Sequence, residues 1–218
     1  FTIYDVTAHD KPKGWHLDYL NPARMTIPQT NLRIGYFITN HYNISIGVDH
    51  MKYVMYNDRR VDYSGYYPNA GSYNENPVGD QLTLDEDFLT FEHTDGLNYV
   101  NTEISRVDDI SSLFKLPNTD KFQINVTEGV GVGLLYPKTN TKLLGKDRYD
   151  QFHIAGYGLS AKVGLNFTFF KYFFIQTELK GGYIDMNDIR TTSSKADSAE
   201  QHFWFLQRIV AVGGIFRI

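Results

Sequence analysis

The feature that most constrains this chain is a strict alternation of apolar and polar residues, which runs from residue 156 to a short turn at "FKY" and then resumes. A period of two predicts β-strands, because successive side chains of a strand point to opposite faces. Globular strands usually run about five or six residues, whereas crossing a bilayer at a tilt takes roughly 9–11 residues. The apolar positions before the turn are Tyr157, Leu159, Ala161, Val163, Leu165, Phe167 and Phe169.

Composition narrows the class of protein. The 218 residues suffice for one large domain or a closed barrel, and we treat 1–218 as a single domain. With 21% charged residues, a mean hydropathy of -0.37 and no run of about twenty apolar residues, no helical membrane span is expected. The 16 Tyr, 15 Phe and 18 Gly favour β-structure.

Charge and cysteine content exclude several functions. A net charge of -4 without a basic stripe argues against a nucleic-acid partner. The absence of cysteine excludes disulfides, thiolate metal sites and cysteine catalysis. The sequence opens on Phe1 without a signal peptide, which we interpret as a removed leader or a missing first part.

Eight long strands are predicted, and the connections between them alternate between long and short. The long ones follow the first, third, fifth and seventh strands, and within the second long one "QLTLDEDFLTF" is predicted to form a hairpin extension. This pattern is typical of outer-membrane barrels, which have short periplasmic turns and longer outside loops. It predicts an all-β, antiparallel up-and-down transmembrane β-barrel with both termini on the periplasmic side. The predicted strands are 1–8, 25–39, 43–56, 97–108, 122–136, 156–169, 173–186 and 202–218.

The polar face of these strands carries charges of both signs. An eight-stranded barrel is only just wide enough for side chains to fill, and buried charges are tolerated when they pair. We therefore expect a plugged interior in place of an open pore. Two charges break the pattern. Glu128 shares the phase of outward apolar residues, so that a bulge or a position near the rim is expected. Arg208 also falls on the outward face, where a bulge would turn it inward. The predicted interior charge network is Arg33, Asp49, Glu103, Lys162, Glu178 and Lys180.

A soluble, lipocalin-like barrel is the alternative fold, with an apolar interior that binds a small apolar ligand. Strand length, loop asymmetry and the aromatic residues at strand ends favour the membrane barrel. In particular, "FTFFKYFF" gathers aromatic side chains around one short turn, as expected of an interfacial girdle.

The chain ends on "GGIFRI", which resembles the terminal strand signal of outer-membrane proteins, with Ile218 in place of the usual final Phe. The segments "YLNPARMTIPQTNLRIGYFITNHYNISIGVDHMKYVM", "FEHTDGLNYVNTE" and "LKGGYIDMNDIRTT" resemble an uncharacterised flavobacterial (Bacteroidota) family of small outer-membrane β-barrels. The resemblance implies an integral outer-membrane location and the barrel fold. It also implies an O-glycosylation signal, which "Asp197-Ser198-Ala199" matches at Ser198.

Chemistry is sparsely encoded. His93 and Asp95 point the same way in a strand and would form a base oriented by a carboxylate, but no Ser stands at a nucleophile spacing and Thr94 points away. A hydrogen-bonded polar rim is the simpler interpretation. The acidic runs "LDED" and "DMND" do not follow a calcium-loop spacing, and the histidines have no metal-ligand spacing, so that no metal or cofactor is expected.

Three functions follow from different classes. The first is a structural or accessory component of the outer membrane, a subunit of a larger complex whose partners are lipid, lipopolysaccharide and other outer-membrane proteins. The second is a narrow channel for small solutes, against which the paired interior charges argue. The third is a lipid-modifying acyl hydrolase or transferase that uses His93.

Overall fold

The computed structural model describes residues 1–10, 30–66, 80–93 and 96–216. These residues form antiparallel β-sheets, and a short 3₁₀ turn, η3 (Ser111–Phe114), lies in the connection between two neighbouring strands of the largest sheet. No helix among them is long and apolar enough to cross a bilayer.

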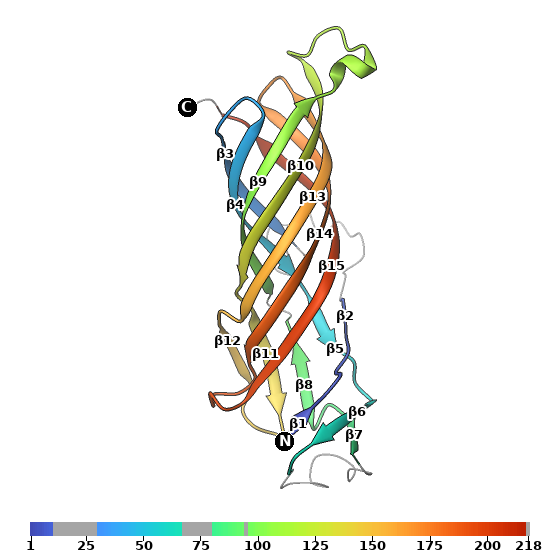
Figure 1. Ribbon diagram of the computed structural model, residues 1–218, viewed down its shortest axis with the longest axis vertical. Helices are drawn as coiled ribbons and strands as arrows, with labels where there is room; N and C mark the ends of the chain where they lie inside the picture. Colours follow the sequence, from blue (N-terminus) through green and yellow to red (C-terminus); the bar gives the residue numbers. More distant parts are fainter. Residues whose placement is uncertain (11–29, 67–79, 94–95, 217–218) are drawn as a thin grey trace.

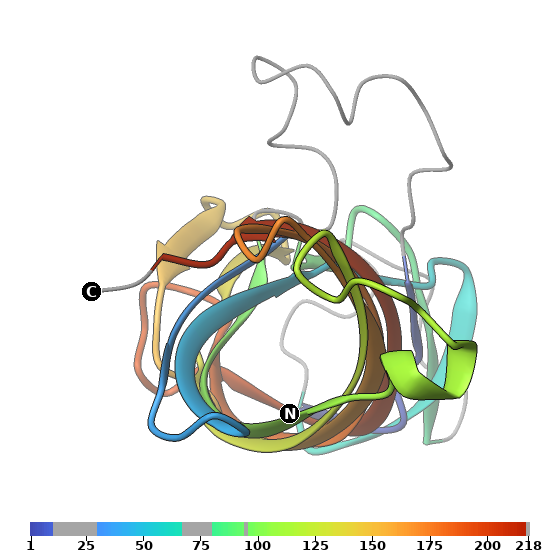
Figure 2. The same cartoon turned by 90° about the horizontal axis from the view of Figure 1, so that it is seen from above.

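The largest sheet has seven strands in the order β15-β14-β13-β10-β9-β4-β3. Each strand is antiparallel to its neighbours, and the sheet curls into a tube (Figures 1 and 2). This confirms the all-β, antiparallel up-and-down prediction. The strands are β3 (Asn31–Phe37), β4 (Tyr42–Met51), β9 (Leu97–Asp109), β10 (Phe122–Leu135), β13 (Gly156–Phe169), β14 (Phe173–Arg190) and β15 (Ser198–Gly214).

The tube has two different ends. The short-turn end holds the connections at residues 38–41, 110–121 and 170–172, and the loop end holds the long connections. At the first of these ends, Phe170 and Lys171 both have positive φ, and the Tyr172 N–H donates to the Phe169 carbonyl at 3.1 Å. These are the features of the tight hairpin turn whose twist matches that of the flanking strands.

A second sheet extends the tube at the loop end, in the order β12-β11-β8-β5-β2. Its strands continue those of the tube: β5 follows β4, β8 precedes β9, β11 follows β10 and β12 precedes β13. A third sheet, β1-β6-β7, lies beyond it (Figure 1). The bounds are β1 (Thr2–Ile3), β2 (Ala8–Asp10), β5 (Tyr53–Met55), β6 (Arg59–Ser64), β7 (Gln81–Leu84), β8 (Leu89–Glu92), β11 (Lys138–Leu143) and β12 (Tyr149–Phe152).

Two sequence predictions about the N-terminal region are wrong. Residues 1–8 do not form a strand of the tube, because β1 pairs with β6 and β2 pairs with β5, both at the loop end. The termini therefore lie at opposite ends: Phe1 is at the loop end, while the Ile215 N–H donates to the Tyr172 carbonyl at the short-turn end. Short segments with alternating residues can pair with any exposed edge, so periodicity alone does not place them.

The predicted hairpin within residues 81–91 is also wrong. Its two halves form strands, but β7 pairs with β6 while β8 pairs with β11 and β5. The other predicted tube strands lie within a few residues of those observed, although residues 25–29 of the second one fall outside the described part of the chain.

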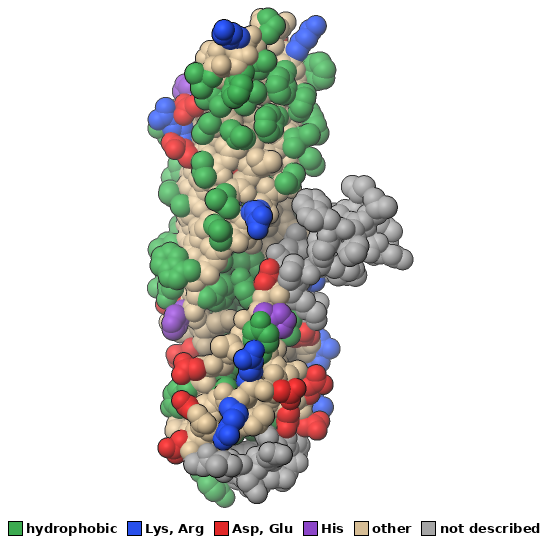
Figure 3. Space-filling view, turned by 90° about the vertical axis from the view of Figure 1, so that its right-hand side faces the viewer, with side chains coloured by type: hydrophobic (Ala, Val, Ile, Leu, Met, Phe, Trp, Pro, Cys, Tyr) green, Lys and Arg blue, Asp and Glu red, His purple; other side chains and the backbone are tan. Residues whose placement is uncertain are grey.

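The two faces of the tube have opposite character. Leu159, Val163 and Leu165 are 52%, 52% and 40% exposed on the outside, whereas Glu103 and Lys180 are 1% and 0% exposed on the inside. Figure 3 shows hydrophobic side chains over the tube and most charged side chains gathered toward the loop end. The burial of a water-soluble protein is thus inverted along this sheet.

Candidate functional site: the interior charge cluster

The six charged residues predicted for the interior meet in the middle of the tube. Arg33 comes from β3, Asp49 from β4 and Glu103 from β9, and Lys162 lies on β13. The two others, Glu178 and Lys180, lie on β14. Three cations and three anions therefore balance one another.

Lys180 lies at the centre of one half of this cluster. Its ammonium contacts the carboxylates of Asp49 and Glu103, the latter with Nζ 2.7 Å from Oε1. Asn101 donates to the Asp49 carboxylate at 3.0 Å. The ring of Tyr99 lies 5.1 Å from the Lys180 ammonium, within range of a cation–π interaction.

Glu178 and Glu103 hold the other half together. Lys162 Nζ lies 2.7 Å from Glu103 Oε2 and 3.1 Å from Glu178 Oε1. Arg33 donates to both oxygens of Glu178 at 3.0 and 3.2 Å, and its Nε lies 2.9 Å from Glu103 Oε2. Gln176 also donates to Glu178. Each carboxylate therefore has more than one partner, the condition under which buried ions are tolerated.

Strand β10 places glycines, which have no side chain, beside the charge cluster. Its inward positions here are Gly129, Gly131 and Gly133. A Cβ on Gly131 would lie only 2.9 Å from Glu103 Cγ and 2.9 Å from Ser160 Oγ. The glycines thus leave room for the long side chains of the facing strands, and the run "TEGVGVG" keeps a continuous register without a bulge.

The interior on either side of the cluster is filled by uncharged side chains. Toward the short-turn end, Asn166 donates to Gln176 at 2.8 Å and Asn125 donates to Asn166 at 3.2 Å. Toward the loop end, Ile184 and Met186 are both fully buried in an apolar cluster. Side chains therefore occupy the described tube from one end toward the other. The inward residues of β14 are, in order, Phe174, Gln176, Glu178, Lys180, Gly182, Ile184 and Met186.

His93, the candidate catalytic base, is 1% exposed at the junction of the tube and the loop-end sheet. Its Nδ1 lies 3.1 Å from Thr139 Oγ1 and its Nε2 lies 3.2 Å from Gln201 Oε1. Burial lowers the pKa of His93 to about 4, against a smaller opposing effect of the bond to Gln201, so that the ring is neutral near pH 7. Asp95 lies outside the described residues. Among the described residues, the side chains hydrogen-bonded to the ring are the Thr139 hydroxyl and the Gln201 amide. No carboxylate orients the ring there, and this is the setting of a buried structural histidine.

Ser198, the candidate glycosylation site, is exposed at the first position of β15. The carboxylate of Asp197, the preceding residue, already has partners. Thr192 Oγ1 donates to it at 2.7 Å, and Lys146 Nζ lies 3.2 Å from it. The bond from Thr192, assisted by Lys146, lowers the pKa of Asp197. The serine is accessible, and its role as an acceptor stays a prediction.

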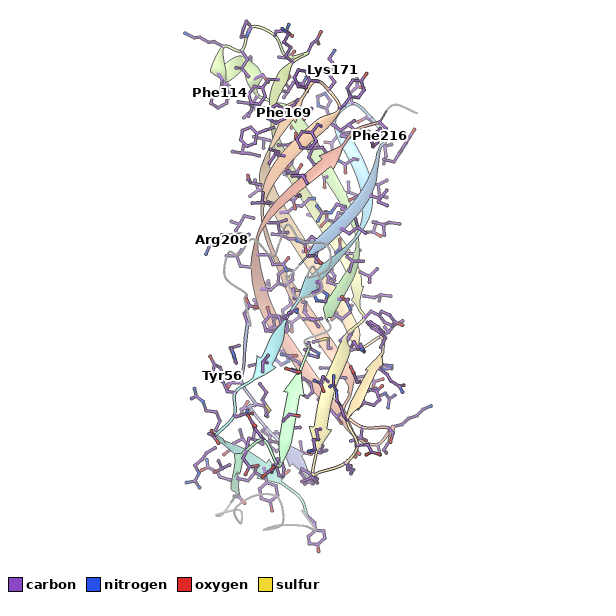
Figure 4. All side chains as sticks on the ribbon, turned by 180° about the vertical axis from the view of Figure 1, so that it is seen from behind. Tyr56, Phe114, Phe169, Lys171, Arg208 and Phe216 are labelled. Carbon is purple, nitrogen blue, oxygen red and sulfur yellow. The ribbon has the colours of Figure 1, made fainter. Side chains whose placement is uncertain are left out.

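The two charges that broke the sequence pattern both lie on the outer face. Glu128 is opposite Arg106 on β9 and Val163 on β13, and Arg208 is opposite Leu179 on β14, all in continuous register. No bulge turns either residue inward. Figure 4 shows Arg208 on the outside of the wall, between Phe216 near one end and Tyr56 toward the other.

A cleft of about 1120 Å³ lies at the loop end between residues 145–151 and 190–195. Its cations are largely paired: Arg148 lies 3.0 Å from Asp150, and Arg190 lies 3.4 Å from Asp188. The cleft therefore does not concentrate unpaired positive charge. Among the residues described, no three acidic or histidine side chains converge as a metal site would require.

Sequence reasoning missed the uncharged members of the cluster. Tyr99, Asn101 and Gln176 were in the inward phase of their strands, which was the only available signal. Whether these side chains contact the charged residues depends on which residues face them across the tube, and the pairing register of the strands sets this.

Comparison with protein-family models, curated proteins and solved structures gives no match for this chain. The resemblance to flavobacterial barrels therefore stays a prediction.

Proposed function

We propose that the protein is an integral component of a bacterial outer membrane, with a side-chain-filled interior and a structural or accessory role. The observation that carries the proposal is the inverted burial of the seven-stranded sheet. Exposing many large apolar side chains to water would be costly and would promote aggregation. The same side chains in contact with lipid tails carry no such cost.

The apolar surface crosses every strand of the sheet. One row of paired positions, all facing outward, contains six apolar or aromatic residues and one threonine. A belt that is continuous from edge to edge fits immersion in a layer of hydrocarbon better than a local docking patch. The row consists of Ile34, Ile46, Thr102, Val132, Leu159, Tyr183 and Trp204.

Exposed aromatic residues flank the belt, as they do at the two interfaces of membrane barrels. Phe170, Tyr172 and Phe173 lie at the short-turn end. Tyr136 stacks on Phe152 at the loop end, with ring centroids 5.1 Å apart. These residues support a placement with the short turns and the long loops in opposite aqueous compartments.

The filled interior supports an accessory role over a channel or an enzyme. The charge cluster joins β3, β4, β9, β13 and β14 across the tube, where a solute would have to pass. His93 is buried between Thr139 and Gln201, away from a described carboxylate.

Quenching of Trp204 by brominated lipid tails tests the proposal. Trp204 is 80% exposed on the outer face, and replacing Trp15 with Phe leaves it as the single tryptophan. After refolding into vesicles, its fluorescence should fall strongly when the lipid carries bromine on the acyl chains. The matched control removes both native tryptophans and introduces Phe205→Trp, at a neighbouring position that is 7% exposed and faces inward.

The control tryptophan should be quenched much less than Trp204. Equal quenching of the two, or a protein that stays monomeric in buffer without detergent, would contradict the membrane location.

A further inference from the structure

The seven-stranded sheet has an open seam between its two edge strands, β3 and β15. Within the described residues, no backbone hydrogen bond joins these strands. Their outward side chains are well exposed: Ile34 on β3 is 76% exposed and Leu206 on β15 is 70% exposed. Unpaired N–H and C=O groups at such an edge are costly in lipid, where water cannot bond them.

The direction of the strands restricts what can fill the seam. Because seven strands alternate in direction, β3 and β15 run the same way, from the loop end to the short-turn end. Direct closure would pair them in parallel. A second copy inserted with the same orientation also offers edges that run this way. Only a strand running from the short-turn end to the loop end is antiparallel to both edges.

Side chains at the seam indicate the chemistry of that strand. Arg208 is exposed on the outer face of β15 and makes no hydrogen bond or ion pair with the described residues. Leu179 of β14 is its neighbour on one side, and the seam is on the other. A guanidinium at mid-belt is unfavourable against lipid, and a carboxylate directly across the seam would offset this unfavourable placement.

The inward face of the same edge also has an unmet hydrogen bond. Gln207 precedes Arg208 and points into the tube, and its Oε1 is buried without a partner among the described residues. A hydroxyl on the inward face of an added strand would supply the donor.

We infer that the seam between β3 and β15 binds one β-strand donated by another polypeptide. The donated strand runs antiparallel to both edges, carries apolar side chains outward and hydroxyl-bearing side chains inward, and places a carboxylate opposite Arg208. This inference rests on the proposed function and deepens it, because it names the surface and the partner of an accessory barrel.

A synthetic peptide of about ten residues, the length of a transmembrane strand, tests the inference on the refolded full chain in detergent micelles. It alternates valine and threonine, with glutamate at one central valine position, and a second peptide carries lysine there. Fluorescence anisotropy of the labelled peptides should show the glutamate peptide binding about tenfold more tightly, the effect of one close charge pair.

Charge reversal of the protein makes the test specific. Arg208→Glu should invert the preference toward the lysine peptide, and the milder Arg208→Gln should abolish it. Arg106→Glu is the matched control, since Arg106 is also exposed on the outer face but lies on β9, flanked by β4 and β10. It should leave the preference unchanged.

Three outcomes would overturn the inference: equal binding of the two peptides, a preference that does not respond to Arg208, or quantitative disulfide formation between cysteines placed at Ile34 and Leu206 without any peptide. The last would show that the sheet closes on itself. If the glutamate peptide is not preferred but Trp204 is strongly quenched, the membrane location holds and the strand-binding inference fails. If the binding depends on Arg208 but Trp204 is not quenched, the membrane location fails and the seam still binds a strand.

Discussion

Lys180 shows at the scale of one residue how this interior is built. Its side chain is fully buried and its charge is matched by Asp49 and Glu103. Such a cluster adds little net stability compared with apolar packing, but removing one member leaves an uncompensated charge in a poorly solvated place. The six charges therefore behave as one unit in mutational experiments.

Lys180→Met should lower the free energy of unfolding by about 3–5 kcal/mol, because it leaves two carboxylates with one cation fewer. Adding Asp49→Asn restores neutrality and should recover most of the loss. Urea titration in micelles measures both variants, and Val163→Met on the outer face provides a control with little change. A double variant as unstable as the sum of the two single variants would contradict a coupled cluster.

His93 gives a pH dependence whose sign follows from its burial. Its pKa in the folded protein is about 4, below the ordinary value of about 6.5. As the pH falls through this interval the unfolded chain takes up a proton before the folded one does, so stability is complete above about pH 6.5 and declines toward pH 4.

The unfolding free energy should therefore fall by about 2–3 kcal/mol between pH 7.5 and pH 4.5 through His93 alone. Other groups titrate in this range too, so the test is the difference between the wild type and His93→Gln. The variant should show a shallower pH dependence by this amount. Identical slopes would mean that His93 is solvated in the folded protein.

The hairpin of β13 and β14 is the clearest unit at the scale of elements. Its turn places Phe170 and Lys171 at φ of 54° and 68°, a region where residues other than Gly, Asn and Asp are strained by about 1 kcal/mol. Here the exposed aromatic girdle and the tight turn compete for the same positions. Phe170 is an exposed aromatic residue in a backbone conformation that would favour Gly or Asn, so the turn carries strain at this position.

Lys171→Gly should raise the free energy of unfolding by about 0.5–1 kcal/mol by relieving this strain. The exposed ion pair between Lys171 and Asp120 is lost, but such pairs contribute little. Urea titration compares it with Tyr172→Gly, a position outside the positive-φ pair, where glycine should be destabilising. Equal effects of the two glycines would rule out relief of turn strain.

The whole molecule is defined by which face meets water. An outward charge should be unfavourable in lipid and harmless in water, so one substitution distinguishes a membrane barrel from a soluble one. Leu159 is half-exposed in the apolar row, between Val132 and Tyr183.

Leu159→Arg should make folding into vesicles less favourable by about 2–4 kcal/mol, because it places a charge against lipid. The control is Glu200→Arg, at an outward-facing position of β15 near the loop end. It should change the free energy of folding by less than about 1 kcal/mol. Folding titrations in vesicles measure both. A neutral or stabilising effect of Leu159→Arg would indicate that this face is in water.

By itself the sequence determined seven strands of the tube, their two faces and the charged members of the cluster, but not the pairing of residues 1–8 or of residues 81–91. Alternation is a local property of the extended backbone, so Leu159, Val163 and the six charged residues could be assigned to opposite faces from spacing alone. Spacing also assigns the glycine run of β10 to the inside and Glu128 and Arg208 to the outside. The bulges considered at these two charges are not present, because the strands keep a continuous register there.

Only the tertiary structure decided the pairings. The partnership of Arg33 with Glu178, 145 residues apart, depends on the register of every intervening strand. The first ten residues pair at the loop end, and within the described part of the chain β3 and β15 leave an open seam. Such choices rest on hydrogen bonds between distant segments, and the local pattern of a strand does not specify which edge it will meet.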